Sequence, residues 1–271
     1  MKRVIDGLIL PASPFGPDHL PDGVAGVFET VLLRAGEPVF FADHWERFSQ
    51  GCRWCGLVEP TAAEEMKGYS AMLAEANGVR SGVLRFATWR RDDGSIGWRI
   101  DVDPPRPHMA QAMFRVNWGP ALPPADENRA FKHLDRGPWL AALRASRAAG
   151  WDEVLLRDTS GKLVEGGVTN VFFVRDGRMH TPALECGPLP GIMRARVLEL
   201  ARASGLKVRE GRFDATDVTA ATEVWLTNSL IGIRPVTLLA DRPFATVRPV
   251  LDRLRKAWRG QYGWDPVVIS H

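Results

Sequence analysis

The sequence has little cysteine and lacks a long apolar run. Only three cysteines occur among 271 residues, too few for the disulfide framework that stabilises small secreted domains. No stretch approaches the roughly 20 apolar residues of a membrane-spanning helix. Near the N-terminus, Asp6 and Gly7 interrupt the apolar run that a signal peptide would require. The cytoplasm is therefore the expected location.

Neither sign of charge is in large excess. The chain has 35 Lys and Arg against 32 Asp and Glu, a formal net charge of +3, and the two signs are interleaved. Proteins that bind nucleic acids or anionic membranes usually gather basic residues into a patch. We therefore expect neither partner. With 45% hydrophobic and 25% charged residues, the chain has the composition and length of a soluble protein with one large or two modest domains.

Cys52 and Cys55 have the CxxC spacing of redox and zinc half-sites. No second pair of cysteines completes a zinc site. Both lie late in a helical pattern that begins at His44, where cysteines three residues apart act as small buried apolar residues. We therefore expect packing rather than a metal site, and the same holds for Cys186.

The first half of the chain is predicted to be α+β. A helix is expected from residue 42 to about 57, and a second after Pro60 with Thr61 and Glu64 as a capping box. The prolines of 103–107 favour an extended linker, so a boundary is placed there, with domains at 1–106 and 107–271. Apolar alternation predicts strands over 4–10, 27–33, 37–41, 81–89 and 98–102.

The second half is predicted to be β-rich with flanking helices. Asp176 and Gly177 are expected to close a hairpin, and Pro138 to sit in the first turn of a helix. Strands are expected over 111–118, 153–157, 163–165, 170–175, 178–181, 207–213 and 224–226, and helices over 138–149, 192–203 and 247–258.

Lys132 is the candidate chemical centre. A lysine amine becomes a covalent catalyst when its surroundings lower its pKa, so that it can form a Schiff base with a carbonyl cofactor. A lysine taken alone is more often a solvated surface residue. Here Lys-His-Leu-Asp-Arg at 132–136 is followed by Glu-Gly-Gly-Val-Thr-Asn at 165–170 and by Leu-Pro-Gly-Ile-Met-Arg at 189–194.

Two further segments, Gly-Val-Phe-Glu-Thr at 26–30 and Glu-Val-Trp-Leu-Thr-Asn-Ser at 223–229, complete an ordered set. The set resembles the fold-type IV, or class IV, family of pyridoxal-phosphate enzymes. The resemblance implies a two-domain α+β fold like that of D-amino-acid aminotransferase, with a small α+β N-terminal domain and a larger β-rich α/β C-terminal domain that carries the lysine. It also implies pyridoxal 5'-phosphate as cofactor, a small-molecule amine as substrate, and a homodimer.

The resemblance also assigns roles to individual residues. Lys132 would hold the cofactor as an aldimine and act as the catalytic base. Glu165 would pair with the pyridine nitrogen, where a carboxylate keeps the ring able to accept electrons. Taken singly, each of the other positions also fits a plain loop, turn or solvated helix face. The implied phosphate and ring contacts are Arg47, Leu189, Ile192, Met193 and Ser229, with Met193 standing where many relatives have Thr.

Arg136 bears on the choice among family members. Many aminotransferases of the family have a Tyr there, whereas Lys-His-Leu-Asp-Arg is similar to the Lys-His-Leu-Asn-Arg of aminodeoxychorismate lyases. The implied reaction converts 4-amino-4-deoxychorismate into 4-aminobenzoate, a folate precursor, and pyruvate. The alternatives are an aminotransferase for D- or branched-chain amino acids and a scaffold without turnover. Arg136, Arg85 and Arg234 are candidates for the substrate carboxylates, and Asp135 departs from the lyase pattern.

Overall fold

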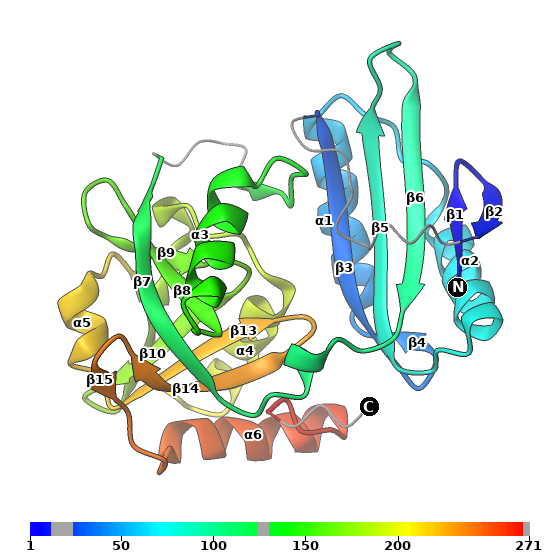
Figure 1. Cartoon of the computed structure of the whole chain (residues 1–271). Coiled ribbons are helices and arrows are strands. Elements are labelled where there is room, and N and C mark those ends of the chain that lie inside the picture. The colour runs from blue at the N-terminus through cyan, green and yellow to red at the C-terminus, as the bar shows by residue number, and fades with distance from the viewer. Residues whose placement is uncertain (12–23, 124–129, 268–271) are drawn as a thin grey trace. The chain divides into compact units, whose positions relative to one another are not determined.

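The structure is a computed structural model that describes residues 1–11, 24–123 and 130–267 (Figure 1). The chain divides into two compact units. The first contains Met1–Pro107 and Phe131–Arg136, and the second contains His108–Ala130 and Gly137–Ser270. The segment with Lys132 therefore belongs to the first unit, whereas we expected it in the C-terminal domain.

The first unit is an antiparallel six-stranded sheet covered on one face by two helices, α1 (Phe41–Trp54) and α2 (Ala63–Asn77). Alternate residues of the strands, among them Val31, Leu84 and Ile100, form one apolar core with residues of both helices. The strand order is β2-β1-β6-β5-β3-β4, with β1 (Lys2–Ile5), β2 (Leu8–Pro11), β3 (Gly26–Arg34), β4 (Glu37–Pro38), β5 (Gly82–Arg90) and β6 (Ile96–Asp103).

Two local expectations for this unit were wrong. The strand expected over 4–10 is the hairpin β1–β2, because Asp6 (φ 48°) and Gly7 (φ 83°) take the left-handed backbone that a tight turn requires. The second helix has Ala62, not Thr61, as its N-cap, and no side-chain cap forms. Cys52 is fully buried in the core, as expected, and none of the three cysteines is in a disulfide.

The Lys132 segment extends the edge of β3. The amide of Phe28 donates to the carbonyl of Lys132 at 3.0 Å, and the amide of Leu134 donates to the carbonyl of Gly26, also at 3.0 Å. Leu134 is buried against Gly26, where a side chain would collide with it. The strand β4 pairs only with the other end of β3, at Leu33 and Arg34. These bonds explain why the segment groups with the first unit.

The second unit is built on a nine-stranded mixed sheet. Apolar side chains of its strands, including Val171, Leu226 and Val236, form the core. The order is β12-β11-β10-β13-β14-β7-β8-β9, with β15 paired to β14; the bounds are β7 (Phe114–Leu122), β8 (Glu153–Asp158), β9 (Leu163–Gly166), β10 (Asn170–Arg175), β11 (Arg178–Pro182), β12 (Val208–Gly211), β13 (Glu223–Asn228), β14 (Gly232–Leu239) and β15 (Arg242–Pro243).

Helices flank this sheet. The helix α3 packs on β7 and β8, and α4 packs on β13 and on α6 (Figure 1). The bounds are α3 (Gly137–Ala148), α4 (Ile192–Ala203), α5 (Ala215–Thr219) and α6 (Pro249–Tyr262), with 3-10 turns at Pro107–Met109 and Leu184–Cys186. Within the described residues, none of the helices is long and apolar enough to cross a membrane.

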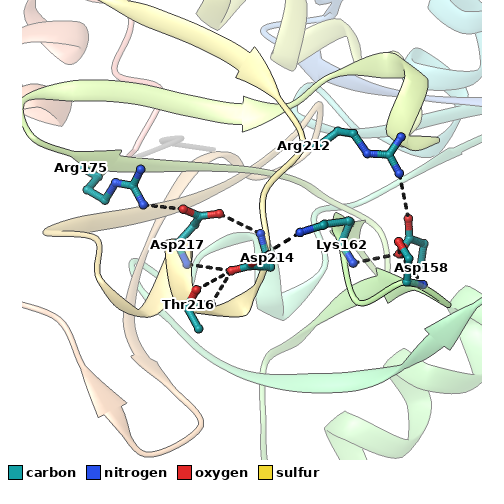
Figure 2. A network of polar contacts seen from close by, with 8 residues as sticks. Asp158, Lys162, Arg175, Arg212, Asp214, Thr216 and Asp217 are labelled. Atoms are coloured by element: carbon teal, nitrogen blue, oxygen red, sulfur yellow. Dashed lines mark hydrogen bonds and ion pairs between the residues drawn. The ribbon is translucent and has the colours of Figure 1, made fainter.

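The short helix α5 is held by a polar network (Figure 2). Asp214 accepts from the backbone amides of Thr216 and Asp217, and Asp217 accepts from the amide of Asp214, which together form a capping box. Lys162, just before β9, forms an ion pair with Asp214, and Arg175 of β10 forms one with Asp217. The network joins α5 to two strands of the sheet.

Candidate active site

Lys132 lies in a desolvated position in the first unit. The residue is half-buried, and its amine nitrogen is 4.9 Å from the centroid of the Phe28 ring. Burial, which disfavours the charged form, lowers the pKa of Lys132 from 10.5 to about 7. The charge of Glu29 works against this shift, whereas the charges of Arg47, Arg136 and Arg85 reinforce it. Near neutral pH a large share of the amine is therefore uncharged and nucleophilic.

Glu29, His44 and Arg47 form a buried cluster between β3 and α1. Arg47 Nε donates to Glu29 Oε1 and Arg47 Nη2 donates to Glu29 Oε2, both at 2.7 Å. His44 Nδ1 lies 2.7 Å from Glu29 Oε2. Burial acts to raise the pKa of Glu29, but Arg47 and His44 together hold it well below its usual range. The pKa of His44 is lowered, chiefly by burial.

This cluster bears directly on Arg47, the expected phosphate ligand. A bidentate pair fixes the plane of a guanidinium, and here two of its three nitrogens already donate to Glu29. The pair with Glu29 therefore fixes the position of the Arg47 guanidinium, and its contact with a phosphate stays a prediction. His44 and Arg47 lie three residues apart on one face of α1, so their spacing indicates a common partner. The sequence analysis did not identify Glu29 as that partner.

The three candidate arginines for substrate carboxylates differ in their surroundings. Arg85 is buried on β5 and Arg136 is half-buried, and both belong to the first unit and act on Lys132. Arg234 is buried in the second unit, where it donates to the backbone carbonyls of Val267 and Met109. Arg234 thus joins loop segments to β14, which is a structural role.

Glu165 lies near the end of β9 and is only 3% exposed. Its Oε1 accepts from the indole Nε1 of Trp139 at 2.8 Å, and its Oε2 accepts from the backbone amide of Leu189 at 3.0 Å. A buried carboxylate held in place by two donors is the kind of group that can pair with a ring N–H. Leu189, expected to contact the cofactor ring, positions Glu165 through its amide.

The N-terminus of α4 begins at Gly191, and Ile192 and Met193 are the first two helical residues. Asn170 Nδ2 donates to the carbonyl of Leu189 at 2.9 Å, and a Cβ atom on residue 191 would collide with Asn170 Oδ1. The side chains of Ile192 and Met193 are buried, so these residues offer only their amides, at the positive end of the helix dipole. Such a terminus is suited to a phosphate.

Ser229 follows the end of β13 in a turn. Asn228 Oδ1 accepts from the amides of Leu230 and Ile231, both at 2.9 Å, and this fixes the turn that presents Ser229. Each unit thus holds part of the expected set. Lys132, Arg47 and Arg136 lie in the first unit, and Glu165, Leu189, Ile192, Met193 and Ser229 lie in the second.

The donor set fits pyridoxal 5'-phosphate. An amine with a pKa near 7 suits the cofactor aldehyde, a helix N-terminus and a guanidinium suit its phosphate, and a buried carboxylate suits its pyridine nitrogen. Sequence reasoning missed Trp139, which donates to Glu165 from α3. A tryptophan in the first turn of a helix carries no signal of that contact, because the partner is 26 residues away along the chain.

Comparison with known proteins gives one family over most of the chain. Residues 26–239 match the family described as amino-transferase class IV. An aminodeoxychorismate lyase of Bacillus subtilis (strain 168) is 25% identical over 233 residues, which cover 80% of this chain and 78% of the relative. A D-alanine aminotransferase of Listeria monocytogenes serotype 4b (strain F2365) is 26% identical over 225 residues, covering 78% and 77%.

Solved structures give the same fold. The branched-chain amino acid aminotransferase of Escherichia coli superposes with a TM-score of 0.83, and the match covers 96% of this chain and 94% of that chain at 21% sequence identity. Another branched-chain amino acid aminotransferase, complexed with N-(5'-phosphopyridoxyl)-L-glutamate, superposes with a TM-score of 0.82 at 22% identity, covering 97% and 94%. The expected fold-type IV architecture is therefore confirmed.

Proposed function

Since the chain belongs to the class IV aminotransferase family, we propose that it is the lyase of that family that converts 4-amino-4-deoxychorismate into 4-aminobenzoate and pyruvate. The cofactor of the family, and of this chain, is pyridoxal 5'-phosphate. The similarity to the Bacillus subtilis aminodeoxychorismate lyase supports this reaction, as does the Lys-His-Leu-Asp-Arg segment at 132–136.

One observation carries the proposal: three arginines act electrostatically on the Lys132 amine. Arg47, Arg136 and Arg85 all act to lower the pKa of Lys132, and Glu29 is the anion that opposes them. A substrate with two carboxylates is favoured by such an excess of positive charge, since guanidinium groups bind carboxylates in a planar fork. Arg136 and Arg85 are the proposed substrate ligands, and Arg47 is assigned to the phosphate.

Each cofactor contact is proposed from the geometry within its own unit. Lys132 holds the cofactor covalently through Nζ. The amides of Ile192 and Met193, the hydroxyl of Ser229 and the guanidinium of Arg47 bind the phosphate. Glu165, held by two donors, keeps a proton on the pyridine nitrogen, and Leu189 packs beside the ring.

Lys132 then performs the proton transfer. When bound, the cofactor supplies an electron sink. Once the substrate amine has displaced it from the cofactor, the uncharged Nζ of Lys132 would remove the proton from the amine-bearing carbon of the substrate. The C–O bond to the enolpyruvyl group breaks, the ring becomes aromatic, and the enolate gains a proton to give pyruvate. Atoms balance without water, because the substrate is the sum of the two products.

The second candidate is an aminotransferase for D- or branched-chain amino acids. This function is favoured by the similarity of the chain to the Listeria monocytogenes D-alanine aminotransferase. The chain also has the fold of the Escherichia coli branched-chain enzyme. In that reaction Lys132 would both remove the proton from the substrate and donate it back, and no group would be expelled from the substrate. The same residues serve both reactions, so only the products distinguish them.

The test supplies purified holoenzyme with 4-amino-4-deoxychorismate, and in parallel with D-alanine or leucine plus 2-oxoglutarate. We expect 4-aminobenzoate and pyruvate in the first assay to form faster than glutamate in the second. Borohydride reduction followed by peptide mapping should place the cofactor on Lys132, with Lys132→Ala as the blank and Lys162→Ala as the matched control. Glutamate without 4-aminobenzoate would establish the aminotransferase. An adduct on another lysine would contradict the assignment of Lys132 as the lysine that binds the cofactor.

A further inference from the structure

Trp139 is the side chain that donates to Glu165. It lies in the first turn of α3, and its Nε1 is 2.8 Å from Glu165 Oε1. The indole is half-buried and packs against a small apolar cluster of α3 and the sheet. That cluster consists of Leu122, Ala142, Leu143, Val154, Leu156 and Val164. An indole has only two side-chain torsions, so this packing fixes the direction of its N–H.

We propose that Trp139 is a positioning residue that sets the orientation and the proton affinity of Glu165. The inference rests on the proposed role of Glu165 as partner of the cofactor's pyridine nitrogen. A hydrogen bond donated to a carboxylate stabilises its anionic form. With the indole donor in place, a proton shared between Glu165 and the pyridine nitrogen stays on the nitrogen, where it strengthens the electron sink.

The backbone around Glu165 supports the same conclusion. Leu189 holds Oε2 through its amide, so neither oxygen can leave its place without loss of a hydrogen bond. The turn after Glu165 is held as well, because the amide of Gly167 donates to Glu153 Oε1 at 3.1 Å. The carboxylate is thus constrained through both of its oxygens and through its backbone. Both donors act on the charge of the carboxylate, and the one from Trp139 is a side chain, so it can be removed by substitution.

The contrasting interpretation is that Trp139 only fills space beside Leu143 and Val154. A space-filling role depends on the size of the ring and is indifferent to the N–H group. Trp139→Phe keeps an aromatic ring and removes the donor, and Trp139→His keeps a ring N–H on a smaller ring. Trp118→Phe is the matched control, since Trp118 is also half-buried against the core of the same unit.

The experiment titrates the visible absorption of the bound cofactor against pH in holoenzyme without substrate. Loss of the donor leaves the pyridine nitrogen less protonated, and the ring then withdraws fewer electrons from the Schiff-base nitrogen. We therefore expect Trp139→Phe to move the midpoint of that Schiff-base nitrogen upward by about half a pH unit or more. We expect kcat to fall about tenfold with KM nearly unchanged, since the lost interaction matters to the chemical step. Trp139→His should recover part of both effects, and Trp118→Phe should show neither.

The outcomes separate this inference from the proposed function. If Glu165→Gln changes the absorption and Trp139→Phe matches wild type, Trp139 only fills space and the inference fails alone. An equal shift in Trp118→Phe would also overturn it. If Glu165→Gln leaves the absorption unchanged, the role of Glu165 fails and this inference fails with it. Because no substrate is present, the choice between lyase and aminotransferase does not affect the titration.

Discussion

At the scale of single residues, the proposed chemistry depends on an amine whose pKa is lowered by its surroundings. Lys132 is desolvated beside Phe28, and the positive charge of Arg47 adds to the effect of burial. Glu29 limits the shift but does not cancel it, because much of its charge is engaged by Arg47 and His44. A carboxylate paired in this way orients a guanidinium and leaves a nearby lysine reactive.

A pH dependence follows from the pKa of Lys132. The rate at which apoprotein attaches pyridoxal 5'-phosphate should follow the uncharged fraction of the amine, which falls as pH drops through the folded-state pKa. We expect the rate to be half-maximal near pH 7, the pKa of about 7 that burial produces. Stopped-flow absorbance across pH 5 to about pH 11 measures it. A midpoint close to that of free lysine would contradict the desolvated position.

A second pH dependence concerns Glu153, which is buried and whose pKa burial raises from 4.5 to about 7. The folded state therefore binds a proton more tightly than the unfolded state, and the stability due to this group falls as pH rises from about 4.5 through 7. Glu153→Gln removes that dependence. Between pH 4.5 and 8, the unfolding free energy of wild type should fall relative to the variant by about 3 kcal/mol at most.

Urea unfolding at both pH values measures this difference for Glu153→Gln. The exposed Glu185→Gln provides the control, since its carboxylate lies at the surface. Stability curves of wild type and Glu153→Gln that run parallel with pH would mean that Glu153 titrates as an ordinary carboxylate.

At the scale of elements, the start of α4 depends on the absence of a side chain. Gly191→Ala would place a Cβ atom against Oδ1 of Asn170, whose Nδ2 donates to the Leu189 carbonyl. We expect a loss of about 1–3 kcal/mol in unfolding free energy and weaker cofactor binding, because the first amides of the helix must shift. Calorimetry and cofactor titration measure both.

The control for this variant is Gly260→Ala in α6, where an added Cβ meets no atom within 4 Å. That change should be neutral or stabilising by up to about 1 kcal/mol, since Gly is a poor helix former. Equal stability of Gly191→Ala and wild type would mean that the helix start tolerates a side chain and does not require glycine.

The helix α4 shows which parts of the fold could be predicted from the sequence. The bounds Ile192–Ala203 were predicted correctly, because Pro190 and Gly191 precede an apolar period. The hairpin β1–β2 was predicted as one strand, although Asp6-Gly7 carried the turn signal. The strand β14 was not predicted. The placement of Lys132 on the edge of β3 was also missed, since strand pairing over a hundred residues leaves no local pattern.

In the candidate site too, local motifs could be predicted from the sequence and contacts between distant segments could not. Ordered motifs identified Lys132, Glu165 and the start of α4, because each motif is continuous in sequence. The contact from Trp139 to Glu165 and the pairing of Arg47 with Glu29 arise from tertiary packing. Contacts between distant segments are therefore the part of the site that one sequence does not reveal.

At the scale of the whole molecule, we expect a homodimer. The strand β2 lies at the edge of the first unit's sheet, and its Leu8, Ile9 and Leu10 are 65%, 50% and 39% exposed. An exposed apolar edge strand is a site for association. Sedimentation equilibrium should give twice the 30.0 kDa chain mass. A fully active 30.0 kDa species would contradict the dimer.

The grouping of Phe131–Arg136 with the first unit has a consequence for dividing the protein. The chain enters the second unit after Pro107, returns for six residues and leaves again at Gly137. A gene cut after Pro107 gives one fragment without Lys132 and another that carries Lys132 without Glu29 and Phe28. The surroundings that lower the pKa of Lys132 therefore exist only when both fragments are joined. Two separate fragments would regain activity only after the Lys132 segment had paired again with the edge of β3.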